Sequence, residues 1–345
     1  MPKVARHKTP LEASIPLACA DEAAAVAFLE AQRWGDSPNC PRCGDTDVSM
    51  MKAKDGSRNA RFLWRCKGCK QQYTVKIGTI MEDSPIPFRH WCLAFYRAAA
   101  SKKGVSALQI QRETGLTYKS ALFLMHRIRW AMAPANEQES KLGANGGVVE
   151  FDETYVGGKP RGVPNWALAT RDGEQTDEPT YNLDGTRRRK KGPAPDFKDR
   201  KTPVVAGVER GGRVKAHVVA NVTPETLSTH VRNMVDTSAT LNTDERASYK
   251  TVGEEYAAHN FVKHSRAEWR NGDAYTNTIE GFFSQLKRQI NGTHHSVTRK
   301  HLHRYVTEVE FKYNTRVMND GERTVRLIQA ADHRRLTYKQ QTSKP

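Results

Sequence analysis

The sequence predicts an α/β protein whose main unit is a mixed five-stranded sheet with helices on both faces, preceded by two smaller modules. Three observations support this prediction. The second half of the chain alternates apolar runs and helical patterns in the order strand, hairpin, helix, strand, helix, strand, helix. Two C-x2-C pairs stand near the N-terminus, and a helix-turn-helix pattern follows them.

Length and charge narrow the class of protein. The 345 residues suggest two or three domains, and 55 Lys and Arg against 38 Asp and Glu give a net charge of +17. Such an excess favours a polyanionic partner, because Lys and Arg release counterions from a phosphate backbone. No apolar run approaches the roughly 20 residues of a membrane-spanning helix, and Pro10, Glu12 and Pro16 interrupt any signal peptide. We therefore expect a cytoplasmic, nucleoid-associated protein with no membrane partner and no disulfides.

The first two predicted units are an N-terminal helical segment (1–33) and a zinc ribbon (34–84). The helical segment holds one helix, near residues 21–33. Two C-x2-C pairs 22 residues apart supply four thiolates, and thiolate-only tetrahedral sites select Zn²⁺. Apolar residues at 62–64 and at 73, 75 and 77 predict the strands of the ribbon. The predicted zinc ligands are Cys40, Cys43, Cys66 and Cys69, whereas Cys19 and Cys92 lack partners at ligand spacing.

Residues 85–135 predict a helix-turn-helix DNA-binding domain. A helix over about 88–100 precedes a short helix, a turn that contains Gly115, and a second helix that ends near Met132. An ordinary helical hairpin gives the same pattern, but the basic charge and the neighbouring ribbon favour DNA binding. The second helix also carries His126, and its predicted DNA-contacting residues are Lys119, Arg127 and Arg129.

The third predicted domain is catalytic and covers residues 146–320, followed by a C-terminal tail (321–345). A strand at 148–156 leads into an insertion (157–203) that is rich in Gly, Pro and basic residues, including Arg187, Arg188 and Arg189. The insertion is interpreted either as a solvated loop or as a basic arm that tracks phosphates. The later elements are expected at 204–210, 214–219, 224–235, 241–244, 248–257, 261–263 and from 277 onwards. This is the element order of a ribonuclease H-like domain.

Three carboxylates on separate elements of this domain predict a metal-dependent phosphoryl-transfer site. Asp152 lies in the first strand, Asp244 ends the fourth, which is expected to be its neighbour in the sheet, and Glu280 lies in the helix after the sheet. Such carboxylates can hold two Mg²⁺ or Mn²⁺ ions about 4 Å apart, one to activate water or a DNA 3′-hydroxyl and one to stabilise the departing 3′-oxygen. Lys287 lies two helical turns, about 10 Å, from Glu280 and is expected to hold the DNA backbone together with Arg288.

These residues resemble those of DDE transposases of zinc-ribbon bacterial insertion sequences, the ISXO-like group. The resemblance covers nearly the whole chain, with Phe283 in place of a frequent tryptophan. It implies that Asp152, Asp244 and Glu280 are the catalytic triad and that Lys287 is the accompanying basic residue. It further implies DNA transposition, in which transposon ends are cleaved and their 3′ ends joined to target DNA. The segments that carry it are the four cysteines, 152–158 (DETYVGG), 243–244 (TD), 277–288 (NTIEGFFSQLKR), 300–305 (KHLHRY) and 313–316 (YNTR) with Asn314.

Two other functions compete with this interpretation. A structure-selective DNA nuclease on the same fold would cleave without joining, and a catalytically silent DNA-binding regulator would keep only the ribbon and the helix-turn-helix. The complete set of carboxylates with Lys287 argues against the silent regulator. We expect double-stranded DNA, both terminal repeats and target, as the partner, and a homo-oligomer, a dimer or larger, on that DNA.

Overall fold

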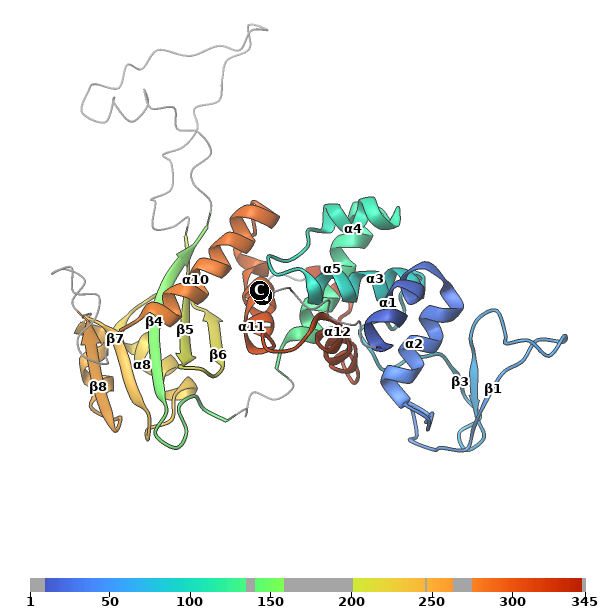
Figure 1. The fold of residues 1–345 in the computed structure, drawn as a ribbon, viewed down its shortest axis with the longest axis horizontal. Coiled ribbons are helices and arrows are strands. Elements are labelled where there is room, and N and C mark those ends of the chain that lie inside the picture. The colour runs from blue at the N-terminus through green and yellow to red at the C-terminus, as the bar shows by residue number, and fades with distance from the viewer. Residues whose placement is uncertain (1–9, 135–139, 158–200, 246, 263–274, 343–345) are drawn as a thin grey trace, which may run out of the picture.

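A computed structural model describes residues 10–134, 140–157, 201–245, 247–262 and 275–342. The chain forms a helical part that carries a small ribbon and a sheet part, and helix α11 (Arg299–Asn314) lies between them (Figure 1). Helix α11 packs on both sides, because Phe311 belongs to the helical core and Leu302 and Val306 belong to the core of the sheet part. No helix in these ranges is long and apolar enough to cross a membrane.

The helical part has one core built from six helices, to which Phe311 of α11 also contributes. Two of these helices were not predicted from the sequence: α1, just before the predicted N-terminal helix, and α12, which occupies the start of the segment expected to be a C-terminal tail (321–345). The predicted helices at 88–100 and after Gly115 are confirmed. The six are α1 (Pro10–Ala20), α2 (Glu22–Trp34), α3 (Phe88–Ala100), α4 (Ala107–Thr114), α5 (Tyr118–Met132) and α12 (Asp320–Gln329).

Local signals define the helix-turn-helix formed by α4 and α5. Ser106 caps α4 by accepting the amide of Gln109, and Thr117 caps α5 by accepting the amide of Ser120. Between the two helices Gly115 ends α4 in the left-handed conformation, at φ +72°. The predicted turn is therefore confirmed as a local structure.

The ribbon is a three-stranded antiparallel sheet of β1 (Val48–Met50), β2 (Trp64–Cys66) and β3 (Gln72–Tyr73). The predicted strands were partly wrong. Only Trp64 and Tyr73 of the proposed strand residues are in strands, while Val75 and Ile77 lie in turns. Val75 nevertheless is buried, in the helical core. Apolar residues there serve packing between the ribbon and the helices rather than a longer sheet.

The predicted mixed five-stranded sheet is present in the order β6-β5-β4-β7-β8. Strand β4 pairs antiparallel with β5 and parallel with β7, and β7 pairs parallel with β8. The helix expected over 248–257 is shorter, because it consists of a 3-10 turn (Ala247–Tyr249) and α9 (Lys250–Gly253). The strands are β4 (Val148–Val156), β5 (Thr202–Glu209), β6 (Val214–Val218), β7 (Thr240–Asp244) and β8 (Ala258–Val262).

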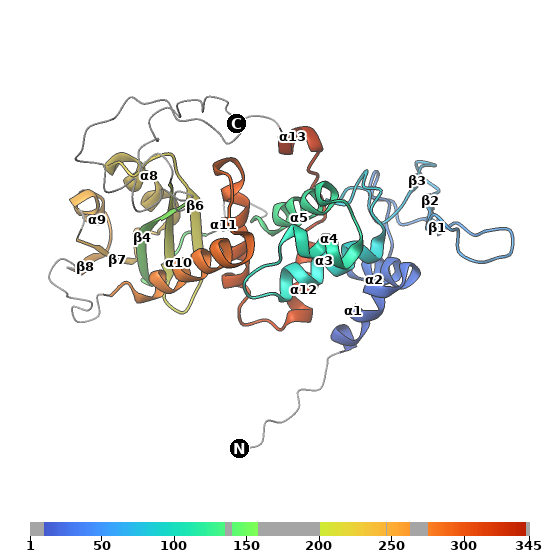
Figure 2. The ribbon, with the colours of Figure 1, turned by 90° about the horizontal axis from the view of Figure 1, so that it is seen from above.

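Helices cover both faces of this sheet, with α8 (Pro224–Met234) on one side and α10 (Asn277–Gln289) on the other (Figure 2). Successive residues of a strand point to opposite faces. Val149 and Phe151 pack with α8, so Glu150 and Asp152 lie on the α10 face. After α10 come a five-residue π-helical turn, η4 (Ile290–His294), and α11; the last helix is α13 (Tyr338–Thr342).

Two polar contacts tie α11 to its neighbours. The Asn314 amide oxygen accepts the backbone amide of Val214 in β6 at 2.8 Å, and its nitrogen donates to the Val214 carbonyl at 3.0 Å. On the other side, Glu308 accepts a 2.7 Å hydrogen bond from Arg129 of α5, and both side chains are buried. The sheet and the helix-turn-helix are thus bound to one helix.

Candidate functional sites

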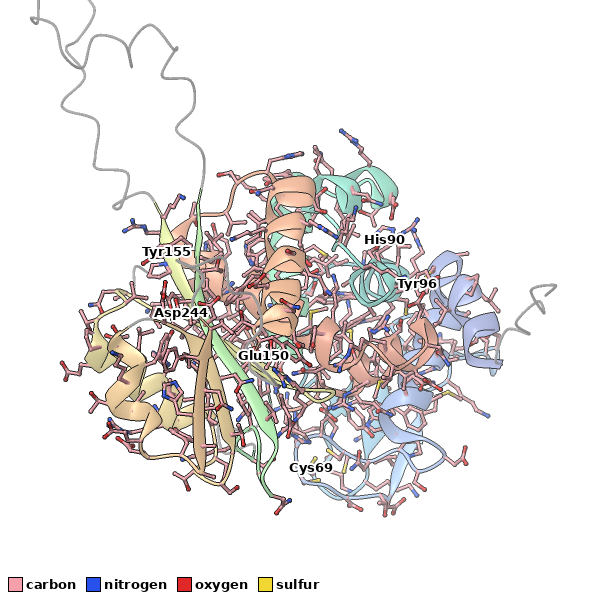
Figure 3. All side chains as sticks on the ribbon, turned by 60° about the vertical axis from the view of Figure 1, so that its left-hand side comes forward. Cys69, His90, Tyr96, Glu150, Tyr155 and Asp244 are labelled. Atoms are coloured by element: carbon pink, nitrogen blue, oxygen red, sulfur yellow. The ribbon has the colours of Figure 1, made fainter. Side chains whose placement is uncertain are left out.

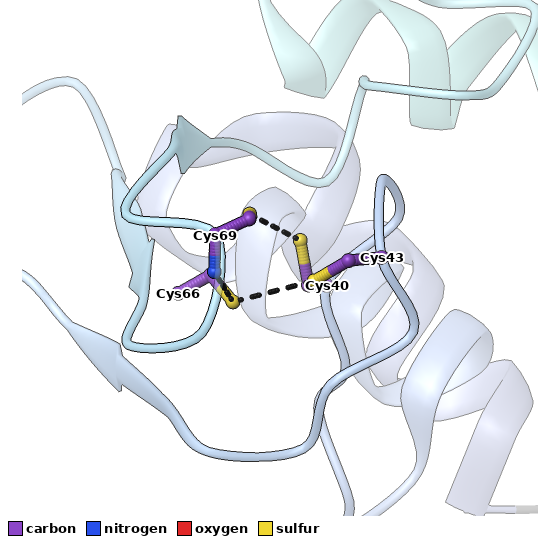
Figure 4. Close-up of side chains that lie close together, drawn as sticks. All are labelled: Cys40, Cys43, Cys66 and Cys69. Atoms are coloured by element: carbon purple, nitrogen blue, oxygen red, sulfur yellow. Dashed lines mark hydrogen bonds between the residues drawn. The ribbon is translucent and has the colours of Figure 1, made fainter.

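The four ribbon cysteines form a compact metal-ligand group (Figure 4). Their sulfur atoms all lie within 4.8 Å of one another, with Cys40 Sγ 3.7 Å from Cys69 Sγ and Cys43 Sγ 3.6 Å from Cys66 Sγ. Four sulfurs about 2.3 Å from a tetrahedral Zn²⁺ would lie about 3.8 Å apart. The donor set and its spacing therefore fit a structural zinc ion.

The backbone around the cysteines prepares this site. Burial opposes ionisation of Cys40, but hydrogen bonds from the backbone amides of Cys43 and Arg42, together with the neighbouring thiols, lower its pKa to about 7. Gly68 leaves room for Asp45, because a Cβ at Gly68 would lie only 2.1 Å from a carboxylate oxygen of that residue. A larger residue at position 68 would therefore displace the Asp45 carboxylate.

Asp152 and Asp244 lie side by side on neighbouring parallel strands. The paired register of β4 and β7 ends with Glu150 opposite Asn242, and Asp152 and Asp244 each follow two residues further along the same face of their strands. Both carboxylates are half-buried and face the α10 side of the sheet. Figure 3 labels Glu150 and Asp244 on these two strands. Asp152 also accepts the backbone amide of Glu153 at 2.7 Å.

Glu280 lies in the first turn of α10, on the helix that packs across this face of the sheet. Its side chain is exposed and accepts a 3.1 Å hydrogen bond from the hydroxyl of Thr276. Among the described residues the cysteines are the one group of three or more ligands within 4.8 Å of one another, so Asp152, Asp244 and Glu280 are not drawn together that tightly. Lys287 and Arg288 are both exposed in the last turn of the same helix.

Glu150 holds the start of α10 against β4, a role that the sequence did not predict. Its side chain is fully buried, and its carboxylate accepts the backbone amides of Thr278 at 2.8 Å and Ile279 at 3.0 Å, as well as the Thr278 hydroxyl. These amides belong to the first turn, where a helix leaves its donors unpaired and favours negative charge. Arg210 neutralises Glu150 at 2.8 Å and stacks on Tyr275.

Should Glu280 not be the third ligand, Glu153 and Asp273 are the alternatives. Glu153 accepts a 2.5 Å hydrogen bond from the hydroxyl of Tyr249. Strand alternation directs Glu153 to the α8 face, away from Asp152. Asp273 lies outside the described residues.

The structure corrects part of the predicted DNA-contacting set. Lys119 is exposed at the N-terminal end of α5, the end that reads DNA in helix-turn-helix proteins. Arg127 is buried and donates to the carbonyls of Leu336, Ile80 and Glu82, and Arg129 is 1% exposed and bound to Glu308.

Both arginines are thus used for internal packing, so the prediction that they contact DNA was wrong. His126 is also buried, and burial together with the charge of Arg129 lowers its pKa to about 2. Arg187, Arg188 and Arg189 lie outside the described residues.

Comparison with known protein families finds a match for each of the two regions that hold these residues. Residues 144–314 match the model of the ISXO2-like transposase domain, and residues 20–72 match that of the transposase zinc-ribbon domain. Together the matches cover more than half of the chain. The chain belongs to the zinc-ribbon, ISXO2-like transposase family. It is also 26% identical, over 294 residues, to an uncharacterised protein in the transposable element ISH50 of Halobacterium salinarum. That alignment covers 84% of this chain and 90% of the relative.

Membership of the ISXO2-like transposase family gives the two sites their context. Transposase domains bind DNA, which agrees with the net charge of +17. The transposase match begins just before β4 and ends at Asn314, so it contains the whole sheet, α10 and α11. The zinc-ribbon match contains all four cysteines.

Proposed function

We propose that this protein is a DNA transposase that binds transposon ends, cleaves the DNA strand and joins the 3′ ends to target DNA by two-metal phosphoryl transfer. The observation that carries the proposal is that Asp152 and Asp244 follow the paired part of two adjacent parallel strands by the same two residues, with Glu280 on the helix that crosses the same face. These three residues are the proposed catalytic triad. Residues 34–84, 85–135 and 146–320 are the proposed ribbon, helix-turn-helix and catalytic domains.

The carboxylates fit Mg²⁺, or Mn²⁺ in its place, because both ions prefer oxygen ligands and keep positions open for substrate. When bound, two such ions activate the attacking oxygen and stabilise the leaving 3′-oxygen. Asp152 and Asp244 would hold the metals from the sheet, and Glu280 would complete the site from α10. The three carboxylates are not within 4.8 Å of one another in the structure, so their side chains would draw together when the site is loaded.

Other residues of the chain position the reactants. Lys287 is exposed two turns after Glu280, about 10 Å along the helix axis, and would hold a backbone phosphate of the bound strand. Glu150 would act as a positioning residue, because its hydrogen bonds to Thr278 and Ile279 hold the first turn of α10 beside β4. Arg210 pairs with that carboxylate at 2.8 Å, so the buried Glu150 has a positive partner.

A joining assay tests the proposed function. The full chain is incubated with Mg²⁺, a labelled duplex that carries the inverted repeat flanking its own gene, and a supercoiled plasmid. The proposal predicts labelled plasmid, and no labelled plasmid when EDTA replaces Mg²⁺. Cleavage without joining would identify a nuclease, and binding without either reaction would identify a silent regulator. Sedimentation of the complex tests the proposed homo-oligomer on DNA.

A further inference from the structure

A cavity of about 430 Å³ lies where the loop between α3 and α4 meets helices α10, α11 and α12. It joins the helix-turn-helix side of the molecule to the C-terminal end of the helix that carries Glu280. Its walls are strongly basic. The charged residues that line it are Lys102, Lys103, Arg288, Lys312, Arg316, Arg323 and a single acid, Asp320.

Three of these six basic side chains already have protein partners, either a carboxylate or backbone carbonyls. Lys312 contacts Glu308 at 2.6 Å, and Arg323 contacts Asp320 at 2.8 Å. Arg316 donates to the backbone carbonyls of Tyr313 and Gly211. The other three, Lys102, Lys103 and Arg288, are exposed and form no ion pair within the described part of the chain. The cavity therefore has an uncompensated positive charge that favours an anion.

The loop that supplies the two lysines is fixed to the end of α10. The hydroxyl of Thr293, in η4, donates to the carbonyl of Lys103 at 2.7 Å. Gly104 has φ +77°, and a Cβ there would lie 3.0 Å from the side chains of Gln289 and Glu308. Only glycine allows this approach without displacing those side chains. Lys102 and Lys103 thus lie at a defined place beside α10.

The same helix connects the cavity to the proposed catalytic site. Glu280 lies in its first turn and Arg288 in its last turn, eight residues later. At 1.5 Å per residue these positions are about 12 Å apart along the axis. A DNA strand at Glu280 can therefore extend past Lys287 to the cavity without leaving the surface of α10.

We propose that this cavity binds a phosphate of the DNA backbone and so guides DNA between the helix-turn-helix and the catalytic face. The inference rests on the proposed function for its ligand, a DNA duplex. The free ammonium groups of Lys102 and Lys103 and the guanidinium of Arg288 are the donors. The bound lysine and arginines of the wall hold the shape of the site.

A salt titration tests the site. Binding of the full chain to a labelled duplex is measured without Mg²⁺ over a range of KCl concentrations, for the parent and for Lys102→Ala/Lys103→Ala. Each bound phosphate contributes about 0.9 to the slope of log K against log salt. The double variant should therefore have a slope smaller by roughly 0.9 to 1.8, and weaker binding at low salt. Both side chains are exposed, so the fold is retained, and the melting temperature checks this.

The matched control is Lys141→Ala/Lys250→Ala, which removes the same charge from two exposed lysines outside the cavity. Its slope should equal that of the parent. A parental slope in the Lys102→Ala/Lys103→Ala protein, or an equal decrease in both double variants, would overturn the inference. The measurement involves no cleavage or joining. The salt titration therefore tests the phosphate site alone, whereas the joining assay tests the proposed transposase chemistry.

Discussion

At the scale of single residues, Glu150 links the strand that carries Asp152 to the helix that carries Glu280. It is fully buried in β4, two residues before Asp152, and binds the first turn of the helix that carries Glu280. A carboxylate in this place satisfies amides that the helix leaves unpaired, and Arg210 neutralises it. The distance between strand and helix is thereby fixed by charge as well as by apolar packing.

Glu150→Gln tests this positioning role. Glutamine has nearly the same size, but its uncharged amide replaces a carboxylate that accepts two backbone amides and pairs with Arg210. We therefore expect a loss of stability of about 2 to 3 kcal/mol. The position of Glu280 should also become less defined, so that joining requires a higher Mg²⁺ concentration and is partly restored by excess Mg²⁺. The Mg²⁺ dependence of joining is the measurement that separates positioning from stability.

Glu308→Gln serves as the control, because Glu308 is equally buried and charge-paired but lies on α11. It should destabilise the protein without changing the Mg²⁺ requirement. An unchanged Mg²⁺ dependence in Glu150→Gln would show that Glu150 is only structural.

Whether the role of a single residue could be predicted from the sequence depends on how far along the chain its contact partner lies. The sequence predicted that Asp152 and Asp244 would be neighbours, because each lies on a short apolar run and the element order implies adjacent strands. Arg127 and Arg129 were misassigned, because their partners Leu336 and Glu308 are 209 and 179 residues away. Glu150 was overlooked for the same reason. The sequence signal that could have identified Glu150 is its position two residues before Asp152, on the same face of the strand.

At the scale of elements, the contact between α5 and α11 depends on a buried charge group. Burial alone raises the pKa of Glu308, but the charges of Lys312 and Arg129 outweigh it and lower the pKa to about 2. A carboxyl whose folded pKa lies below its unfolded value of about 4.3 stabilises the fold above that unfolded pKa. This contribution is lost as the pH falls from about 4.3 towards about 2.

Glu308→Gln should therefore cost about 3 to 5 kcal/mol at pH 7, because it leaves Arg129 and Lys312 buried without their negative partner. Urea unfolding at several pH values measures this cost, and the difference from the parent should decrease below about pH 4.3. The exposed pair between Glu113 and Arg97 provides a control, since Glu113→Gln should cost less than about 1 kcal/mol. Equal stability of the parent and Glu308→Gln at pH 7 would contradict this account.

The ribbon is the second element that allows a direct test. Its three short strands and their few buried residues form a small core, so bound zinc should supply much of its folding energy. Purified protein should contain about one zinc per chain, and Cys66→Ser should contain much less. Cys19→Ser, outside the ribbon, should keep its zinc. Elemental analysis gives the ratio, and a ribbon that remains folded in metal-free protein would contradict the assignment.

The elements themselves were predicted to different degrees for physical reasons. The strands and helices of the sheet part follow clear apolar periodicity, so their order and most of their bounds were predicted. Helix α1 was missed because Pro16 lies within it and its sequence has little amphipathic pattern. The strands of the ribbon were misplaced because metal ligation and packing on the helices, rather than alternation, decide where they end.

At the scale of the whole molecule, the net charge of +17 favours contact with DNA at several places, and residues 187–191 are a run of five basic residues. Replacing Arg187, Arg188 and Arg189 by glutamine should make DNA affinity less dependent on salt, by up to about 0.9 in slope for each phosphate that these arginines bind. Filter binding at several KCl concentrations measures the slope. A slope equal to that of the parent would show that these arginines are solvated and do not hold DNA.

The central claim is that Asp152, Asp244 and Glu280 together form one metal-dependent site for cleavage and joining. The most direct test compares the parent with Glu280→Gln, which removes a negative metal ligand and keeps nearly the same side-chain size. We expect end binding to remain, since it depends on other domains, and joining with Mg²⁺ to fall by at least about 1,000-fold, or about 4 kcal/mol. A Glu280→Gln protein that binds the transposon end and joins it to plasmid at the parental rate would contradict the account.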